Sequence, residues 1–409
     1  MQRVFEKTTI GDLIIGMFVA ELDRPWLDTP FLLQGFLIEE QADIDALAKH
    51  CQYVFVDRGL SKVSFASTGP KTNIKKTGVA ALFPNTNLKA YQDSTSIEEE
   101  LLTARRIMTQ LSQAVTECFT EQLKGQPLSL TLLSEASQQM VDSMVRNPDA
   151  MLWLNRLKAI DNYTYQHAIS VSIWMVALGR QLGLPKDDLC TLSLAGLLLD
   201  IGKTSIPNYI LEKTTRLTPA EFALVKRHIE LGLYEIEKVD NISSQILETI
   251  EYHHERFDGS GYPKGVAGSS IPVFARIAAI ADCYDAITTI RPYAPAVSPS
   301  AAVKKLFHWR NKDFQSELIE EFIQAIGIYP AGSLVELSSG EVGIVLAEYR
   351  SRRLRPKIIQ LLDRNKVPLH TVHVIDMLET THDLDGSELN IINSLEPEAF
   401  DIDISQLDL

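Results

Sequence analysis

The feature that most restricts the fold of this chain is a long series of helical patterns between residues 96 and 326. The segment SIEE at 96–99 is a capping-box pattern, and it opens a helix that is predicted to run to about Leu123. One face of that helix is kept apolar by Ile107, Leu111, Val115 and Cys118. Further helical patterns follow at about 129–146, 149–159, 161–183, 186–200, 218–236, 242–254, 271–290, 298–308 and 312–326. No strand-like alternation interrupts them, so the sequence predicts an all-helical domain of about 230 residues over 96–330.

A smaller domain is predicted before the helices. Residues 1–61 mix short apolar runs with turns, and they include one helical pattern at Gln41–His50 and one strand pattern at Tyr53–Asp57. This combination indicates a small α+β domain. Residues 62–95 are rich in Ser, Thr, Gly, Pro, Asn and Lys, with little periodicity, which is typical of a linker.

The pattern changes again after Pro330. Residues 331–378 alternate apolar and polar side chains between turn signals, which predicts a short β appendage. Residues 379–409 carry many Asp and Glu and no Lys or Arg, so an acidic tail that is solvated or disordered is expected. The predicted fold class is therefore mainly α, with an α+β domain at the N-terminus and β structure at the C-terminus.

Composition and charge exclude several classes of protein. Hydrophobic residues make up 45% and charged residues 22% of the 409 residues, as in ordinary globular proteins. The net charge of −14 argues against sequence-independent binding to DNA, RNA or an anionic membrane surface. The four cysteines are dispersed, the N-terminus lacks the apolar stretch of a signal peptide, and no apolar run reaches the length of a membrane span. A cytoplasmic protein is expected.

Histidines and carboxylates recur within the predicted helical domain in a pattern suited to metal binding. The candidate ligands are His167, Asp200, His228, His253, His254 and Asp282. Each has an ordinary structural explanation when taken alone: His167 could be a polar residue of a buried helix, Asp200 a helix cap and His228 part of a solvated face. Asp282 and Asp285 are harder to explain in this way, because an unpaired carboxylate after an apolar run is costly.

Taken together, the segments that carry these residues resemble the HD-GYP family, a branch of the HD phosphohydrolases. The matching segments are YTYQHAISVS, LAGLLLDIGKTSIP, LVKRHIELG, YHHERFDGSGYP and IAAIADCYDAITTIRPY, within residues 150–330. The first sixty residues also resemble a small N-terminal domain of unknown function that some members carry. The resemblance implies a helical HD-type domain with a metal centre of two or three ions, usually iron or manganese. It also implies hydrolysis of cyclic di-GMP to pGpG or GMP.

The resemblance assigns roles residue by residue. One metal site would use His167, Asp200 and Asp282. The second would use Asp200 as a bridge together with His228, His253 and His254. Asp200 and Lys203 are the expected catalytic residues. The expected substrate contacts are Lys203, Arg291 and the loop residues Gly261, Tyr262 and Pro263.

This sequence departs from the family pattern at three positions. Leu199 stands where the family has the histidine of its His-Asp pair, and leucine cannot ligate a metal. Tyr163 stands where some members supply a glutamate for a third ion, and Ala294 stands where a basic residue is common. One or two divalent ions are therefore expected.

Three hypotheses for function follow. The first is a cyclic di-GMP phosphodiesterase that is impaired by Leu199 but still active. The second is a catalytically degenerate module that acts as a cyclic-dinucleotide receptor or as a scaffold for a partner such as a diguanylate cyclase. The third is a phosphodiesterase for a mixed cyclic GMP-AMP. A homodimer is a further expectation.

Overall fold

The computed structural model describes residues 5–23, 36–58, 61–63, 79–157, 163–291, 295–349, 354–397 and 399–402. The chain divides into two compact units. The first comprises Met1–Thr77 with Tyr349–Leu354, and the second comprises Gly78–Glu348 with Arg355–Leu409. Each unit is described by itself.

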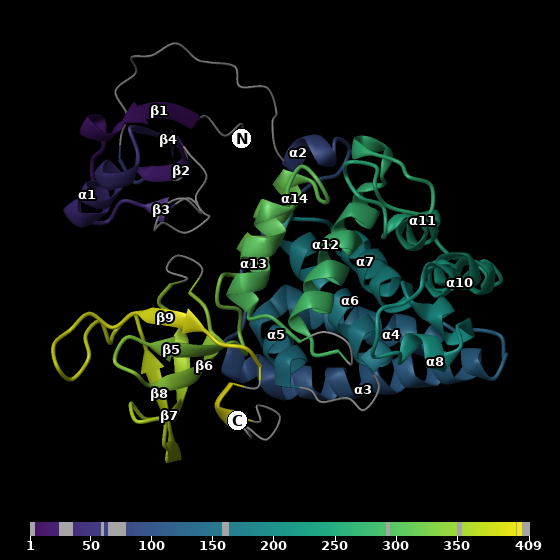
Figure 1. Ribbon diagram of the computed structural model, residues 1–409. Coiled ribbons are helices and arrows are strands. Elements are labelled where there is room, and N and C mark those ends of the chain that lie inside the picture. The colour runs from purple at the N-terminus through teal and green to yellow at the C-terminus, as the bar shows by residue number, and fades with distance from the viewer. Residues whose placement is uncertain are drawn as a thin grey trace. The chain divides into compact units, whose positions relative to one another are not determined.

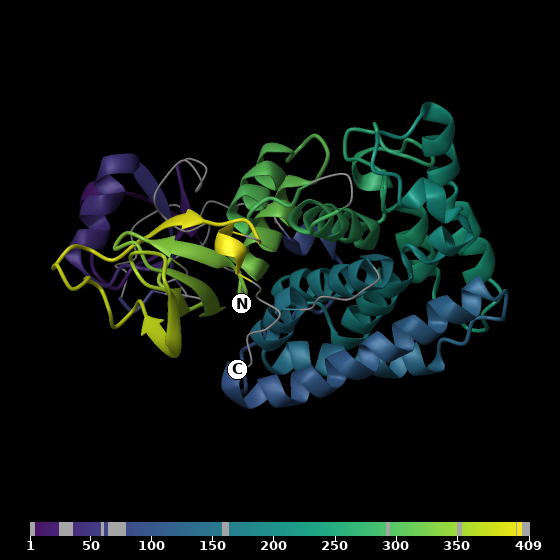
Figure 2. The same cartoon turned by 60° about the horizontal axis from the view of Figure 1, so that its bottom comes forward.

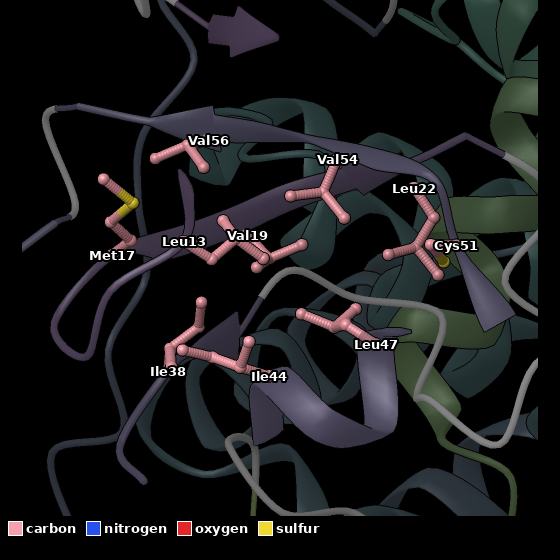
Figure 3. Close-up of a cluster of buried hydrophobic side chains, with 10 residues drawn as sticks. All are labelled: Leu13, Met17, Val19, Leu22, Ile38, Ile44, Leu47, Cys51, Val54 and Val56. Atoms are coloured by element: carbon pink, nitrogen blue, oxygen red, sulfur yellow. The ribbon is translucent and has the colours of Figure 1, made fainter. Parts of the chain in front are cut away.

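The first unit is a small antiparallel sheet packed against one helix. Its strands are β1 (Phe5–Thr9), β2 (Phe18–Leu22), β3 (Phe36–Leu37) and β4 (Tyr53–Asp57), in the order β1-β4-β2-β3. The helix α1 covers Gln41–His50, so both the helix and the last strand agree with the prediction. Ile44 and Leu47 of α1 face Val54 of the sheet (Figure 3). The apolar residues that gave the helical and strand patterns in the sequence are therefore the ones buried in this core.

The second unit contains most of the helices (Figure 1). They are α2 (Val79–Leu82), α3 (Ile97–Leu123), α4 (Thr131–Arg146), α5 (Pro148–Leu157), α6 (Tyr163–Gln181), α7 (Lys186–Leu198), α8 (Asn208–Leu211), α9 (Pro219–Lys226), α10 (His228–Ile236), α11 (Ser244–Tyr252), α12 (Val273–Thr288), α13 (Pro299–His308) and α14 (Ser316–Ile326). The predicted capping box of α3 is present, since Ser96 Oγ accepts from Glu99 N at 3.2 Å. Glu99 Oε2 accepts from Ser96 N at 3.0 Å in return.

Helix α6 is the centre of the helical domain. Every residue from His167 to Arg180 is buried, because α3, α7, α12 and α14 all pack against it. Figure 2 shows α6 and its neighbours enclosed between the long α3 on one side and α12 to α14 on the other. A helix that is apolar on all faces is stable only in such a position. His167 is therefore held inside the domain.

Two expectations for this region are wrong. The pattern predicted as one helix over 218–236 is interrupted at Arg227, and His228 begins the new helix α10. The predicted linker 62–95 is not a linker in its second half, because Lys89 N donates to Gly183 O at 2.7 Å and Tyr91 Oη donates to Leu184 O at 2.8 Å. This segment satisfies carbonyl groups of the turn that follows α6. Residues 64–78 lie outside the described residues.

The C-terminal β structure is a five-stranded antiparallel sheet with the order β8-β7-β6-β5-β9. The strands are β5 (Leu334–Leu337), β6 (Val342–Ala347), β7 (Lys357–Leu362), β8 (Pro368–Asp376) and β9 (Ile391–Ser394). The expectation of a solvated or disordered tail is corrected for its described part, because β9 pairs with β5, and residues 403–409 lie outside the described residues. Leu389 is buried and Ile391 packs against the same core, so apolar burial outweighs the acidic composition of the tail.

None of the helices in the described part of the chain combines the length and the apolar character that crossing a bilayer requires.

Candidate metal centre

Four of the six predicted ligands form one compact cluster. Asp200, His228, His253 and His254 each offer one ligand atom, and these atoms all lie within 4.8 Å of one another. The residues come from three places in the fold: the end of α7, the start of α10 and the end of α11. Residues more than 50 positions apart are therefore brought together by the packing of short helix ends.

Asp200 and Lys203 are positioned by a short 3₁₀ helix over Ile201–Ser205, for which Asp200 is the N-cap residue. Residues three apart lie above one another in a 3₁₀ helix, so the two side chains share a face. Lys203 Nζ lies 2.5 Å from Asp200 Oδ2. Burial raises the pKa of Asp200, but Lys203 and the surrounding histidines outweigh burial and hold that pKa well below its usual range. The carboxylate is therefore ionised and able to bind a cation.

Gly202 allows this 3₁₀ helix to approach α10 closely. A Cβ atom at position 202 would collide with the backbone carbonyl oxygen of His228 and with the backbone nitrogen of Gly232. Glycine is the residue type that permits such an approach between two backbones. The DIGK segment thus sets the distance between Asp200 and His228, whose Nε2 lies 3.5 Å from Asp200 Oδ1.

Replacing Gly202 with alanine is expected to lower the stability of the protein by about 1–3 kcal/mol and to reduce its metal content, since the backbone must move away from His228. Thermal unfolding and metal analysis of the purified variant measure both effects. Gly11→Ala is a matched control, because a Cβ there meets nothing within 4 Å. Unchanged stability and metal content in Gly202→Ala would contradict this role.

Two of the three histidines of the cluster, His228 and His253, direct their Nε2 atoms toward a ligand by using Nδ1 as a hydrogen-bond donor. His228 Nδ1 lies 2.7 Å from Val225 O, and His253 Nδ1 lies 2.7 Å from Ile250 O. A carbonyl oxygen can only accept, so both Nδ1 atoms carry the proton and donate it. The Nε2 atoms therefore hold the lone pair that a metal needs.

The electrostatic environment keeps these imidazoles neutral. Burial lowers the pKa of His228 to about 4, and it also lowers the pKa of His253 and of His254. Neutral imidazole is the form that ligates metals. His228 Nε2 is buried and makes no hydrogen bond within the described part of the chain. A buried polar atom without a partner is rare, and a cation beside Asp200 would satisfy it, so these residues fit a divalent metal.

His167 and Asp282 lie directly beside this cluster. His167 Nε2 is 3.0 Å from Asp282 Oδ1 and 3.6 Å from Asp200 Oδ2. Asp282 Oδ2 is 3.8 Å from His254 Nδ1, so the six predicted ligands form one continuous group. Burial lowers the pKa of His167, but the carboxylates of Asp282 and Asp285 outweigh burial and raise that pKa to about 10. A metal at this end of the group would have to displace a proton from His167.

Asp285, which the predicted ligand set lacks, contacts the predicted ligand His167. Its Oδ2 accepts from His167 Nδ1 at 2.6 Å, and its Oδ1 accepts from Trp174 Nε1 at 3.3 Å. One carboxylate oxygen thus orients the ring of His167, and the bond from Trp174 to the other oxygen holds the carboxylate in place. The signal in the sequence is the spacing of three between Asp282 and Asp285, which places both on one face of α12.

Replacing Asp285 with asparagine is expected to weaken metal binding by about 10–100-fold, because the histidine loses the carboxylate that fixes its orientation. Titration of the metal-free protein with Mn(II) measures the affinity. Asp142→Asn, at a side chain that is 39% exposed and pairs with Lys186, is the control. Equal affinities in Asp285→Asn and the control would show that Asp285 does not position the ligand.

The positions that depart from the family pattern have structural roles of their own. Leu199 is 3% exposed and continues the helical backbone beyond α7. Tyr163 stacks on the ring of His167, with the centroids 5.5 Å apart. Ala294 lies outside the described residues. At two positions where the family supplies ligands, this chain thus has an aromatic ring that stacks on His167 and a buried apolar side chain that precedes Asp200.

The loop after the paired histidines is folded back against them. A Cβ at Gly261 would collide with the backbone of His254, Glu255 and Arg256, so glycine is required there. Glu255 is buried, and its Oε1 accepts from Lys264 N at 2.7 Å and from Gly265 N at 3.0 Å. Glu255 therefore anchors the loop, a role that the motif alone did not predict.

The predicted substrate contacts differ in their position relative to the cluster. The ring of Tyr262 stacks on the ring of His254, with centroids 4.8 Å apart, and Pro263 is exposed beside it. Arg291 follows the end of α12 and lies close enough to Cys283 to act on the pKa of that thiol. Tyr262 therefore lies beside a predicted metal ligand, and substrate contact by Tyr262, Pro263 and Arg291 stays a prediction.

Comparison with known proteins adds independent evidence. The family described as HD domain matches residues 140–318, and a domain of unknown function, DUF3391, matches residues 6–131. The chain is 35% identical over 371 residues to the cyclic di-GMP phosphodiesterase PA4108 of Pseudomonas aeruginosa, covering 90% of this chain and 87% of that protein. It is 32% identical over 206 residues to the cyclic di-GMP phosphodiesterase response regulator RpfG of Xanthomonas campestris pv. campestris, covering 50% and 54%. It is 37% identical over 159 residues to the 3'3'-cGAMP-specific phosphodiesterase 1 of Vibrio cholerae, covering 39% and 37%.

Proposed function

Because the chain belongs to the HD-GYP branch of the HD domain proteins, we propose that it is a metal-dependent phosphodiesterase that hydrolyses cyclic di-GMP. The observation that carries this proposal is the cluster of Asp200, His228, His253 and His254, with Lys203 paired to its only carboxylate. The similarity to PA4108 over 87% of that protein supports the choice of substrate. Opening one phosphodiester adds one water across a P–O bond and gives linear pGpG, and opening the second gives GMP.

The residues of the site divide the work of this reaction. His228, His253, His254 and Asp200 would hold a divalent ion, and iron or manganese suits this mixture of nitrogen and oxygen ligands. The ion would supply Lewis acidity and lower the pKa of the attacking water. Lys203 places a positive charge beside Asp200, where it can neutralise a phosphate oxygen.

The number of ions is expected to depend on the His167 end of the group. His167 and Asp282 are present there, but Leu199 offers no lone pair. We therefore propose one firmly held ion at the histidine cluster and a weaker second site at His167, Asp200 and Asp282. The four cysteines are free, which fits a reducing cytoplasm as the place of action.

Two alternatives have observations in their favour. The buried Leu199 favours a receptor that binds the cyclic dinucleotide without hydrolysing it. The 37% identity to a 3'3'-cGAMP-specific phosphodiesterase favours a mixed cyclic dinucleotide as substrate. A diguanylate cyclase-type partner and a homodimer stay predictions.

The deciding experiment is anaerobic incubation of the purified full-length chain with Fe(II) or Mn(II) and cyclic di-GMP or cyclic GMP-AMP. Formation of pGpG or GMP from cyclic di-GMP, at a higher kcat/KM than for the mixed dinucleotide, would support the proposal. Binding without product would make the chain a receptor. Preference for cyclic GMP-AMP would reassign the substrate.

A further inference from the structure

A row of aromatic rings and one cation leads outward from the metal cluster. Tyr262 stacks on His254 at 4.8 Å, and Lys226 Nζ lies 4.8 Å from the centre of the Tyr262 ring. The same ammonium group lies 4.7 Å from the centre of the Phe222 ring, which meets Tyr262 edge-on at 6.2 Å. The ring of Tyr262 therefore connects the predicted metal ligand His254 to Lys226 and to Phe222.

Helix α9, which carries Phe222 and Lys226, has no role in the apolar core. None of its residues from Pro219 to Lys226 is buried, and the ring of Phe222 is 44% exposed. The helix is held instead by polar contacts: the Thr218 cap accepts from Glu221 N, and Lys213 pairs with Glu221 at 2.7 Å. Phe222 and Lys226 are four residues apart and so share a face. Packing alone does not explain an aromatic ring at this position.

The charge of Lys226 is also unusual for this surface. Lys203, Lys213, Lys238 and Lys264 each pair with a carboxylate at 2.5–2.8 Å. For Lys226 no carboxylate partner is found among the residues that the structure describes, and its ammonium group lies over the two aromatic rings of Phe222 and Tyr262. The three protons of its ammonium group are therefore available to a ligand.

We propose that Phe222 and Lys226 bind one guanine base of the cyclic dinucleotide whose phosphodiester reaches the metal cluster. An exposed aromatic ring stacks on a nucleobase, and a lysine ammonium donates to O6 and N7 of guanine. Adenine presents an amino donor in place of O6. The ammonium group would then face another donor, which disfavours binding of adenine. Tyr262 lies between this base site and His254 and so separates it from the reacting phosphate. The inference deepens the proposed function and rests on it.

The test measures dissociation constants for cyclic di-GMP and cyclic di-AMP by titration calorimetry on the Mn(II)-loaded full-length chain, with product formation followed in parallel. Phe222→Ala is expected to weaken binding of both dinucleotides by about 10-fold, because stacking does not depend on the base. Lys226→Ala is expected to weaken binding of cyclic di-GMP by about 10-fold and to leave cyclic di-AMP nearly unchanged, which removes the preference for guanine.

Two neighbouring residues of the same segment supply matched controls. Leu224→Ala removes an apolar side chain that is 40% exposed on another face of α9, and Arg227→Ala removes one positive charge next to Lys226. Neither is expected to change the dissociation constants. Hydrolysis of bis(p-nitrophenyl) phosphate is expected to stay at the wild-type rate in these two control variants.

Several results would overturn the inference. Wild-type affinity in Phe222→Ala would exclude stacking, and equal weakening of both dinucleotides in Lys226→Ala would assign the cation to a phosphate. Absence of binding to the wild-type chain would remove the base site together with the proposed function. Binding without product would contradict the proposed hydrolysis but not the base site. The dissociation constants of the variants would still test whether Phe222 and Lys226 bind the base.

Discussion

Replacing Asp200 with alanine is expected to remove the bound metal and to abolish hydrolysis of cyclic di-GMP. Asp200 is the only carboxylate of the histidine cluster, and its Oδ2 also lies 3.6 Å from His167 Nε2. Both ends of the ligand group therefore depend on one side chain. Losses from indirect ligand partners already reach about 10–100-fold in metal affinity, so removal of this direct ligand is expected to exceed about 100-fold.

The measurement is metal content after purification, together with the rate of pGpG formation. Asp282→Ala is the informative comparison, because Asp282 contacts His167 and His254 but does not belong to the four-residue cluster. Asp282→Ala is expected to keep the ion at the cluster, whereas Asp200→Ala is expected to lose it. Asp200→Asn preserves the size of the side chain and tests whether the effect is a folding defect. Metal content equal to wild type in Asp200→Ala would show that the ligand assignment is wrong.

Replacing Leu199 with histidine is expected to raise the metal content from about one to about two ions per chain and to raise the rate of hydrolysis by about 10–100-fold. The change restores a nitrogen ligand next to Asp200, at the end of the group where His167 and Asp282 already lie. Position 199 is only 3% exposed, so an imidazole there is costly unless a metal or a hydrogen bond satisfies it. The melting temperature of the metal-free variant is therefore expected to fall, and added Mn(II) is expected to restore it.

Leu199→Gln is the matched control, since it introduces a polar side chain of similar size without an imidazole. It is expected to lower stability without a gain in metal or activity. If Leu199→His behaves like Leu199→Gln, the pocket does not accept a second ion, and the receptor hypothesis gains support over an impaired enzyme.

Most of the secondary structure of the helical domain could be predicted from local patterns. The capping box at Ser96, the apolar face of α3 and the helix Gln41–His50 depend on neighbours within a few residues, so their sequence signals are complete. The interruption at Arg227 was not predicted, because both sides of it carry helical patterns and its cause lies in the packing of His228 against the segment of Gly202. Strand β9 was missed for a similar reason: its partner β5 is more than 50 residues away.

The sequence alone determined which residues could bind a metal. The order and spacing of His167, Asp200, His228 and the pair His253-His254 indicated the family and the ligand types, because those motifs are local and specific. The same reading identified Leu199 as the departure. The family resemblance also grouped Asp200 with His228, His253 and His254, but the sequence could not indicate what holds these side chains in place.

Only the tertiary structure decided the geometry of the site. The contact of Gly202 with His228, the two hydrogen bonds that Asp285 accepts and the row from His254 to Lys226 all join different helices. Periodicity reports which side of a helix faces inward, but it carries no information on which neighbour that side meets. The distances between the ligands and the contacts that hold them therefore depend on helix packing, because they join residues that are remote in the chain.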